Sequence, residues 1–256
     1  MISSKRKLVS CAMALGLSLS VNLGFVAPSL GQSSDTPPVL QPKFTATCTD
    51  TDRAILSKAH SNMAKMLDDA LDGVTVETSS IEYTESFGAS DFGRDFTVLA
   101  RLLLLRIGAA TVEMTANCVP AGADAICDAG TWAYVSKQQL GAADNKYNIN
   151  FCRSFFDATD EDVQAISMWK KASVMQGAVF LHELTHFSWA TKALLREVGM
   201  EPDDSAQDQA GSKDVEYDAE GVKYLAGTDP EQAILNADSY HIFIMRLAVR
   251  KGLIYN

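Results

Sequence analysis

Cysteine, histidine and long hydrophobic runs are all scarce in this chain of 256 residues. Its five cysteines form no CxxC pair, which argues against a cysteine-rich metal site. After the N-terminal region, no apolar stretch is long enough to span a bilayer. We also find no internal repeat, no low-complexity tract and no N-x-Ser/Thr sequon, so the sequence predicts neither a repeat architecture nor N-glycosylation.

Basic residues are also in the minority, with 22 Lys and Arg against 32 Asp and Glu and a net charge of -10 at pH 7. This balance disfavours nucleic acid and anionic membranes as partners and favours basic ones. Simple solubility explains the same charge equally well. We therefore expect no nucleic-acid partner, no membrane partner and a monomer.

The N-terminus is typical of a secretory signal peptide. A positive head at positions 5–7 precedes an apolar run over 8–19, and small residues follow it. We expect a signal peptide over residues 1–31, a short polar leader over 32–47 and a single domain over 48–256. The protein would then be secreted and extracellular; a retained membrane anchor is the alternative.

Cysteine usage agrees with export. Four cysteines remain after removal of the signal peptide, namely Cys48, Cys118, Cys127 and Cys152. Four cysteines in an exported protein indicate two disulfides, and the sequence alone allows three pairings. The remaining length is enough for one domain with a sizeable core.

Hydrophobic periodicity predicts helices over about 50–71, over 95–117, from about 160 past 186, and from 230 to about 250. The second is apolar over much of its circumference, which predicts burial. The third contains a break near 171–176. Short strands are expected over 131–135 and 147–151, joined by a turn-rich stretch. Helices that flank a small sheet define an α+β domain.

The most informative stretch is His182-Glu183-Leu184-Thr185-His186, an HExxH pattern on the third predicted helix. Residues four apart on a helix lie one turn above each other, so both rings can face one ion. Glu183 can then reach a metal-bound water without ligating the metal. The pattern predicts a zinc ion held by His182 and His186, with Glu183 as general base; a core helix with two satisfied histidines is the alternative.

A catalytic zinc usually has a third protein ligand. Metzincins would place a glycine and a histidine where this chain has Trp189 and Lys192, so that class is excluded. Thermolysin-like enzymes use a glutamate about twenty residues later, and the segment 202–208 contains none. The next candidate is Asp214, which follows Gly211 in a predicted loop.

HExxH followed by Gly211-Ser212-Lys213-Asp214-Val215-Glu216-Tyr217 resembles the aspzincins, the family of fungal deuterolysins and peptidyl-Lys metalloendopeptidases. In that family zinc is held by the two histidines of HExxH and by the aspartate of a GTxxDxxYG motif. The resemblance implies one zinc per chain, bound by His182, His186 and Asp214. It also implies that Tyr217 faces the substrate carbonyl; an aromatic residue packed near a turn is the alternative.

The motif departs from the family pattern at three positions. Asp214 lies one residue closer to the glycine, Ser212 replaces the usual threonine, and Asp218 occupies the position of the closing glycine. Glu216, Asp218 and Glu220 are therefore alternatives to Asp214 as the third ligand.

The resemblance covers nearly the whole mature chain. Asn236-Ala237-Asp238-Ser239-Tyr240 is similar to a segment on the last helix of these proteases. The cysteines also lie where the peptidyl-Lys enzymes have theirs, which implies the pairs Cys48–Cys118 and Cys127–Cys152.

Substrate preference is expected to be weaker than in those enzymes, where this aspartate and a glutamate three residues later hold the lysine after the cut bond. Asp238 matches the first residue, whereas His241 replaces the second. The resemblance thus implies a reduced preference for a basic residue. A carboxylate on the helix surface, or one that supports a ligand, is the alternative for Asp238. His241 can also be a surface residue, and His60 is expected to be one.

The expected function is therefore a secreted zinc-dependent endopeptidase that hydrolyses peptide bonds in proteins or peptides by Glu183-assisted attack of zinc-bound water. A catalytically inactive binding or effector protein on the same scaffold is the alternative, since the motif around 211–218 is altered. A zinc hydrolase for a non-peptide substrate is a third reading.

Overall fold

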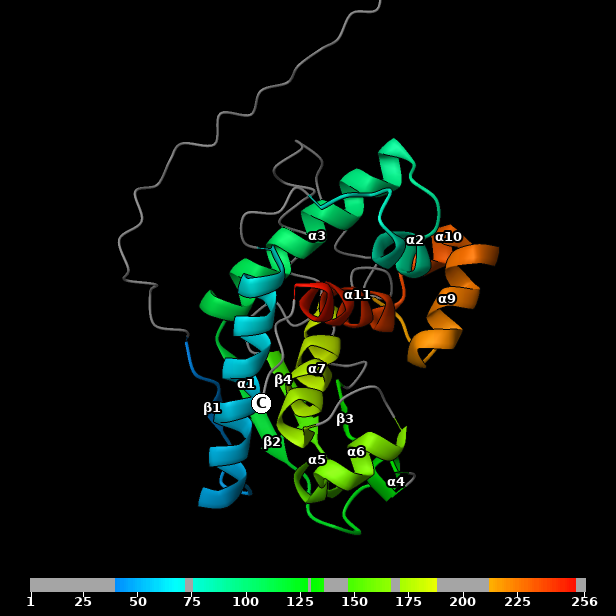
Figure 1. Cartoon of the computed structure of the whole chain (residues 1–256). Helices are drawn as coiled ribbons and strands as arrows, with labels where there is room; N and C mark the ends of the chain where they lie inside the picture. Colours follow the sequence, from blue (N-terminus) through cyan, green and yellow to red (C-terminus); the bar gives the residue numbers. More distant parts are fainter. Residues whose placement is uncertain are drawn as a thin grey trace, which may run out of the picture. The chain divides into compact units, whose positions relative to one another are not determined.

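The computed structural model describes residues 40–71, 76–128, 130–135, 147–166, 171–187 and 212–251. They lie in one unit that spans Pro37–Asn256 (Figure 1). The expected signal peptide, the turn-rich joint between the two predicted strands and the segment 188–211 lie outside the described residues. Among the described helices, none has both the length and the apolar character that crossing a membrane requires.

The first long helix, α1 (Asp50–Leu71), starts with a reciprocal pair of hydrogen bonds. Thr49 Oγ1 accepts the N–H of Asp52 at 3.2 Å, and Asp52 Oδ2 accepts the N–H of Thr49 at 3.0 Å. Such a capping box satisfies two backbone donors that a helix start leaves free. The apolar positions that predicted this helix, Met63 and Leu67 among them, are fully buried.

The helix that carries HExxH, α7 (Ala172–Thr185), packs against α1, against α11 (Ala237–Arg250) and against β3 (Figure 1). Gly177 allows the close approach of α1. A Cβ at this position would lie 2.8 Å from Met66 Cε and 3.2 Å from the backbone nitrogen of Met63. The motif is thus held between two other helices and the sheet.

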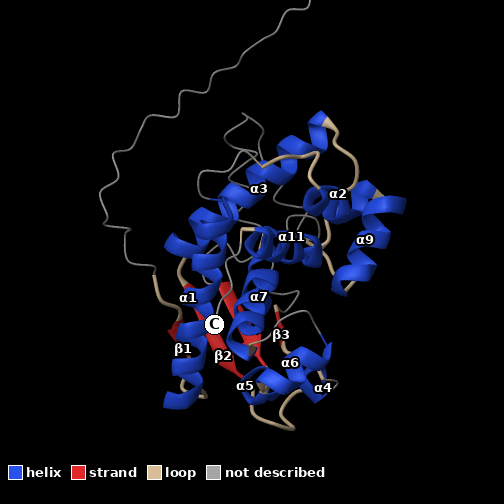
Figure 2. Cartoon of the chain, in the orientation of Figure 1, coloured by secondary structure: helices blue, strands red, loops and turns tan. Residues whose placement is uncertain are grey.

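Four short strands form one sheet in the order β1-β2-β4-β3 (Figure 2). They are β1 (Lys43–Phe44), β2 (Met114–Cys118), β3 (Ala133–Tyr134) and β4 (Tyr147–Phe151). The pairs β1–β2 and β2–β4 are parallel, and β3–β4 is antiparallel. Helices around a small sheet confirm the α+β class. The pairing of β1 also brings part of the segment expected as a leader into the fold.

Disulfides join Cys48 to Cys118 and Cys127 to Cys152, as the family resemblance implies. The first ties the start of α1 to the end of β2, and the second ties α4 to the residue after β4.

The other described helices are α2 (Ile81–Phe87), α3 (Phe92–Thr111), α4 (Ala125–Asp128), α5 (Arg153–Asp157), α6 (Asp160–Ile166), α9 (Asp218–Thr228) and α10 (Pro230–Ala233). The helix α2 packs on α9 and α11. Its Tyr83 and Phe87 rings lie 5.9 and 5.4 Å from the ring of Phe243 in α11, which joins the C-terminal helix to the core.

The prediction of one buried helix over 95–117 is wrong in two respects: the helix ends earlier, and one of its faces is exposed. The helix α3 ends at Thr111, and the following residues form β2 with alternating burial. Pairing of β2 with strands on both sides is a non-local interaction that outweighs local helical periodicity. On the helix itself, Leu103 and Ile107 are exposed, at 55% and 56%.

The last predicted helix is instead two helices, α10 and α11, separated at Ile234–Asn236. The backbone there leaves the helix to bond with another segment: Lys213 N–H donates to Leu235 O at 2.7 Å, and Ala237 N–H donates to Lys213 O at 2.9 Å. The break expected near 171–176 is confirmed only at its first residue: Lys171 is not helical, whereas α7 begins at Ala172, whose N–H donates to Asp160 Oδ1.

His60 is buried, not a surface residue as expected. It lies on the face of α1 that packs against α7, where its ring meets Phe180 edge-on at a centroid distance of 5.2 Å.

Candidate metal centre

The two histidines of HExxH lie at the C-terminal end of α7, where His186 is the capping residue. His182 Nδ1 lies 2.5 Å from Asp238 Oδ1, and His186 Nδ1 lies 2.9 Å from the carbonyl oxygen of Ser212. Because a carboxylate and a carbonyl can only accept, each Nδ1 must donate a proton. In the neutral rings each Nε2 atom therefore presents a lone pair.

Asp214 brings the third donor to the same point from the loop before α9. Its Oδ1 lies 3.1 Å from His182 Nε2 and 3.4 Å from His186 Nε2, and the two Nε2 atoms are 3.1 Å apart. Three electron-pair donors at these separations repel one another unless a positive charge lies among them. Two imidazoles and one carboxylate are a typical donor set for catalytic zinc, so the residues fit this ion.

The charge balance around His182 also favours a cation. Burial opposes the charging of this ring, but its hydrogen bonds to Asp214 and Asp238 outweigh burial and raise its pKa well above the usual value. The surroundings of His182, between Asp214 and Asp238, therefore favour positive charge, which a divalent ion would supply.

The acidic alternatives to Asp214 do not join the two histidines. Among the described residues, the His/Asp/Glu groups close enough to hold one ion are His182, His186 and Asp214, and a second set of His182, Asp238 and His241. Asp218 instead caps α9, because its Oδ1 accepts the N–H groups of Glu220 and Gly221 at 2.9 Å each.

Asp218 also has a φ of 60°, in the left-handed region that favours glycine. This explains why a glycine can stand at this position in the family motif.

Glu183 directly follows His182 on α7 and is only 3% exposed. In the described part of the chain, its Oε2 has no hydrogen-bond partner. Burial, partly opposed by His182, raises the pKa of this carboxyl to about 7. A carboxyl with a pKa near neutrality can both accept and release a proton at mild pH, as a general base requires.

The remaining predicted residues lie at the edges of this centre. Tyr217 is largely exposed and precedes α9, and the partial burial of its side chain together with the nearby Asp214 carboxylate raises the pKa of its phenol. His241 lies on α11 with its ring 5.7 Å from that of His182. Its side chain is 12% exposed, so it is not a surface residue.

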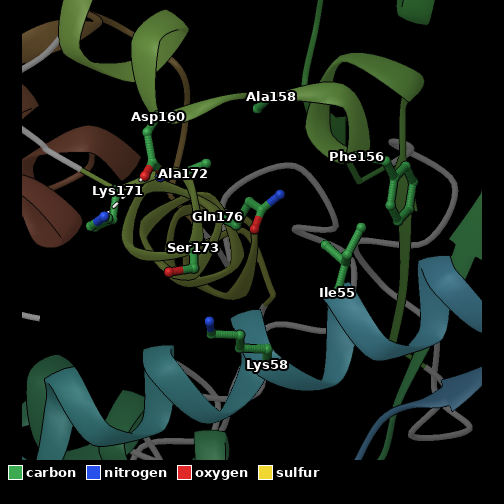
Figure 3. Close-up of a pocket in the computed structure, with 9 residues that line it drawn as sticks. All are labelled: Ile55, Lys58, Phe156, Ala158, Asp160, Lys171, Ala172, Ser173 and Gln176. Atoms are coloured by element: carbon green, nitrogen blue, oxygen red, sulfur yellow. Dashed lines mark hydrogen bonds and ion pairs between the residues drawn. The ribbon is translucent and has the colours of Figure 1, made fainter. Parts of the chain in front are cut away.

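A separate pocket lies near the other end of α7, between α1, α5 and α6 (Figure 3). It has a volume of about 430 Å³ and includes Lys58, Lys171 and Gln176 in its lining. None of the metal-centre residues lines this pocket.

Comparison with known families agrees with this geometry. The model of the aspzincin family, described as lysine-specific metallo-endopeptidase, matches residues 74–245, which include the whole metal centre. The chain belongs to the aspzincin family. Peptidyl-Lys metalloendopeptidase of Grifola frondosa is 24% identical over 211 residues, covering 81% of this chain and 48% of the relative. The aspzincin chain therefore spans about half the length of that protein.

The solved structure of a zinc peptidase from Grifola frondosa has a similar fold, with a TM-score of 0.54 at 22% sequence identity. The match covers 79% of this aspzincin and 98% of the solved chain.

Sequence reasoning did not find several residues that support the metal centre. Arg101 donates to Ser212 Oγ at 2.9 Å and to the carbonyl oxygen of Ile234 at 2.9 Å. It therefore links the loop before Asp214 to the segment that precedes α11. The sequence indicates Asn236 only as part of a segment similar to the last helix of the aspzincins, although its Oδ1 accepts the N–H of Val215 in the loop that carries Asp214. The sequence offers one signal, an arginine at position 101 within an otherwise apolar run.

Proposed function

We propose that this aspzincin is a secreted zinc-dependent endopeptidase that hydrolyses peptide bonds in proteins or peptides. The single observation that carries the proposal is the convergence of His182, His186 and Asp214 within 3.4 Å of one another, beside the buried Glu183. Family membership supports the same reaction class. The predicted signal peptide and the two disulfides support export, since disulfides persist in oxidising compartments.

In the proposed reaction His182, His186 and Asp214 would hold the zinc, and the ion would supply a Lewis acid that lowers the pKa of a water. Glu183 takes a proton from the attacking water and returns it to the leaving amine. The phenol of Tyr217 donates a hydrogen bond to the oxygen on which negative charge develops, an interaction that is strongest in the transition state. Tyr217 suits this role because it is exposed and adjacent to Asp214.

The proposed preference for a basic residue after the cut bond is weaker than in a peptidyl-Lys enzyme. Asp238 supplies negative charge near the centre, since contacts with His241 and His182 outweigh burial and lower its pKa to about 2. His241 adds no negative charge, because an imidazole is either neutral or positive, and burial lowers its pKa to about 4, so the ring is neutral at pH 7. A cleavage profile on a peptide library, without Lys or Arg enrichment after the cut, would refute this part of the proposal.

Digestion of denatured casein tests the activity itself. We expect cleavage that a chelator abolishes and added zinc restores. Glu183→Gln should still bind one zinc, because its side chain is not a ligand, but its rate should fall by roughly 10²- to 10⁴-fold. Absence of cleavage by the zinc-loaded wild type would favour a binding protein or a hydrolase of another substrate class, and a fully active variant would remove Glu183 as the base.

A further inference from the structure

The segment Asn236-Ala237-Asp238 at the start of α11 contacts both parts of the metal centre, the helix with the histidines and the loop with Asp214. The two polar side chains of this segment are buried, at 0% and 6% exposure. They lie fifty or more positions after HExxH in sequence. Tertiary contact alone brings them to the metal centre.

Both carboxylate oxygens of Asp238 are committed to the protein. Its Oδ1 accepts from His182 Nδ1 at 2.5 Å, and its Oδ2 accepts the backbone N–H of Asp218 at 2.9 Å. His241 Nδ1 lies 3.4 Å from the same Oδ1. A substrate ammonium group would have to displace one of these partners to reach the carboxylate directly.

Asn236 holds the loop immediately after Asp214. Its Oδ1 accepts the N–H groups of Val215 at 3.0 Å and Glu216 at 3.2 Å, and its Nδ2 donates to Ser239 Oγ at 3.2 Å. Asp238 accepts the N–H of Asp218, so Asn236 and Asp238 together accept three backbone N–H groups. The residues of this loop before position 218 are not helical. A short loop is fixed in place when its backbone donors are satisfied by buried acceptors.

We propose that Asn236 and Asp238 are positioning residues of the metal centre: Asp238 orients His182, and Asn236 fixes the loop that presents Asp214. This inference rests on the proposed function, because the ion whose ligands these residues would position is the proposed zinc. Holding the proton on Nδ1 keeps Nε2 of His182 free as a ligand, and the negative charge behind the ring makes it a stronger base. Asp238 therefore acts on the metal centre through His182, and its charge attracts a basic substrate residue without direct contact.

The test is zinc affinity, measured by competition between apo-protein and a chromophoric chelator. Asp238→Asn keeps the size of the side chain and removes its charge. We expect it to weaken zinc binding by roughly 10- to 100-fold while the apo-protein keeps the wild-type circular dichroism spectrum. Cobalt substitution should also give an altered absorption spectrum, since the cobalt d–d bands report ligand geometry.

Asp52→Asn is the matched control. Asp52 is equally buried, at 3%, and accepts from Arg153 at 3.0 Å at the far end of α1. Its variant should bind zinc within about twofold of wild type, since no ligand contacts it. A comparable loss of zinc affinity in this control would mean that any buried carboxylate has this effect, and would overturn the proposal.

If Asp238→Asn does not fold, two variants of Asn236 test the proposal in its place. Asn236→Leu removes the acceptor for the two loop N–H groups and should weaken zinc binding, whereas Asn236→Asp retains acceptor oxygens and should restore most of it. Equal affinity in the Leu variant and wild type would refute the role of Asn236.

Asp238→Asn also separates a positioning role from a substrate pocket. Unchanged zinc affinity with a loss of Lys and Arg preference would assign Asp238 to substrate binding and overturn the inference. Failure of the wild type to bind zinc stoichiometrically would instead refute the proposed function. Wild type that binds zinc and cleaves casein, beside a variant that binds zinc as tightly, would refute only the positioning role.

Discussion

Replacement of His60 tests whether a buried neutral histidine makes this fold sensitive to acid. The ring is fully buried between α1 and α7, and in the described part of the chain neither ring nitrogen has a hydrogen-bond partner. Burial therefore disfavours the charged form and lowers the pKa from 6.5 to about 4. The change we propose is His60→Leu, which keeps a similar volume and removes the titration.

The sign follows from where the proton binds. Between pH 6.5 and about 4 the unfolded chain binds a proton at His60 that the folded chain does not, so stability falls as the pH decreases through this range. Above pH 6.5 both states are neutral and the effect vanishes. The full shift corresponds to roughly 3 kcal/mol, of which about 2 kcal/mol is lost between pH 7 and pH 5.

The assay is urea unfolding of the metal-free wild type and of His60→Leu at pH 7 and pH 5. Other groups titrate in both proteins, so the difference between the two pH-dependent losses isolates His60. We expect wild type to lose about 2 kcal/mol more than the variant over this interval. Equal losses in the two proteins would refute the reasoning, since they would mean that His60 has the same pKa in the folded and unfolded states.

Two further substitutions test how the structure supports the metal centre. Gly177→Ala should destabilise the fold by roughly 1 kcal/mol in urea unfolding, because the new methyl group would lie 3.2 Å from the backbone of α1 and overpacking exceeds the gain in helix propensity. Gly227→Ala is its control: among the described residues, no atom outside the adjacent helix backbone lies within 4 Å of the new Cβ, so stability should rise by up to about 1 kcal/mol, and a loss would contradict the packing argument. Asp218→Ala should cost roughly 2 kcal/mol in thermal unfolding, from the lost cap of α9 and from a φ of 60° that alanine disfavours. Asp218→Asn keeps both features and should stay near wild type, so equal losses in the two variants would exclude this explanation.

Local rules predicted the parts of the fold that depend on neighbouring residues. The capping oxygens at Thr49 and Asp52 and the apolar spacing after them predicted α1, and the two short segments after position 130 predicted β3 and β4. The family resemblance, and not any local rule, supplied both disulfide pairings and favoured Asp214 over the other acidic candidates, because each joins residues far apart in the chain.

The errors share a physical origin. The end of α3 was missed because β2 depends on hydrogen bonds to strands from both sides, which local periodicity does not encode. The division of the last helix at Asn236 depends on its bonds with the loop at Lys213. His60 was expected at the surface because a polar side chain usually is, but the close packing of α1 on α7 buries it.

By itself, then, the sequence determined that His182 and His186 share one side of a helix with Glu183 beside them, since a four-residue spacing needs nothing beyond helical geometry. Only the tertiary structure places Asp214 beside the two histidines, fixes which way their Nδ1 protons point, and places Asp238 behind His182. These features depend on distances between segments that only the packing of α11 and its preceding loop against α7 brings together.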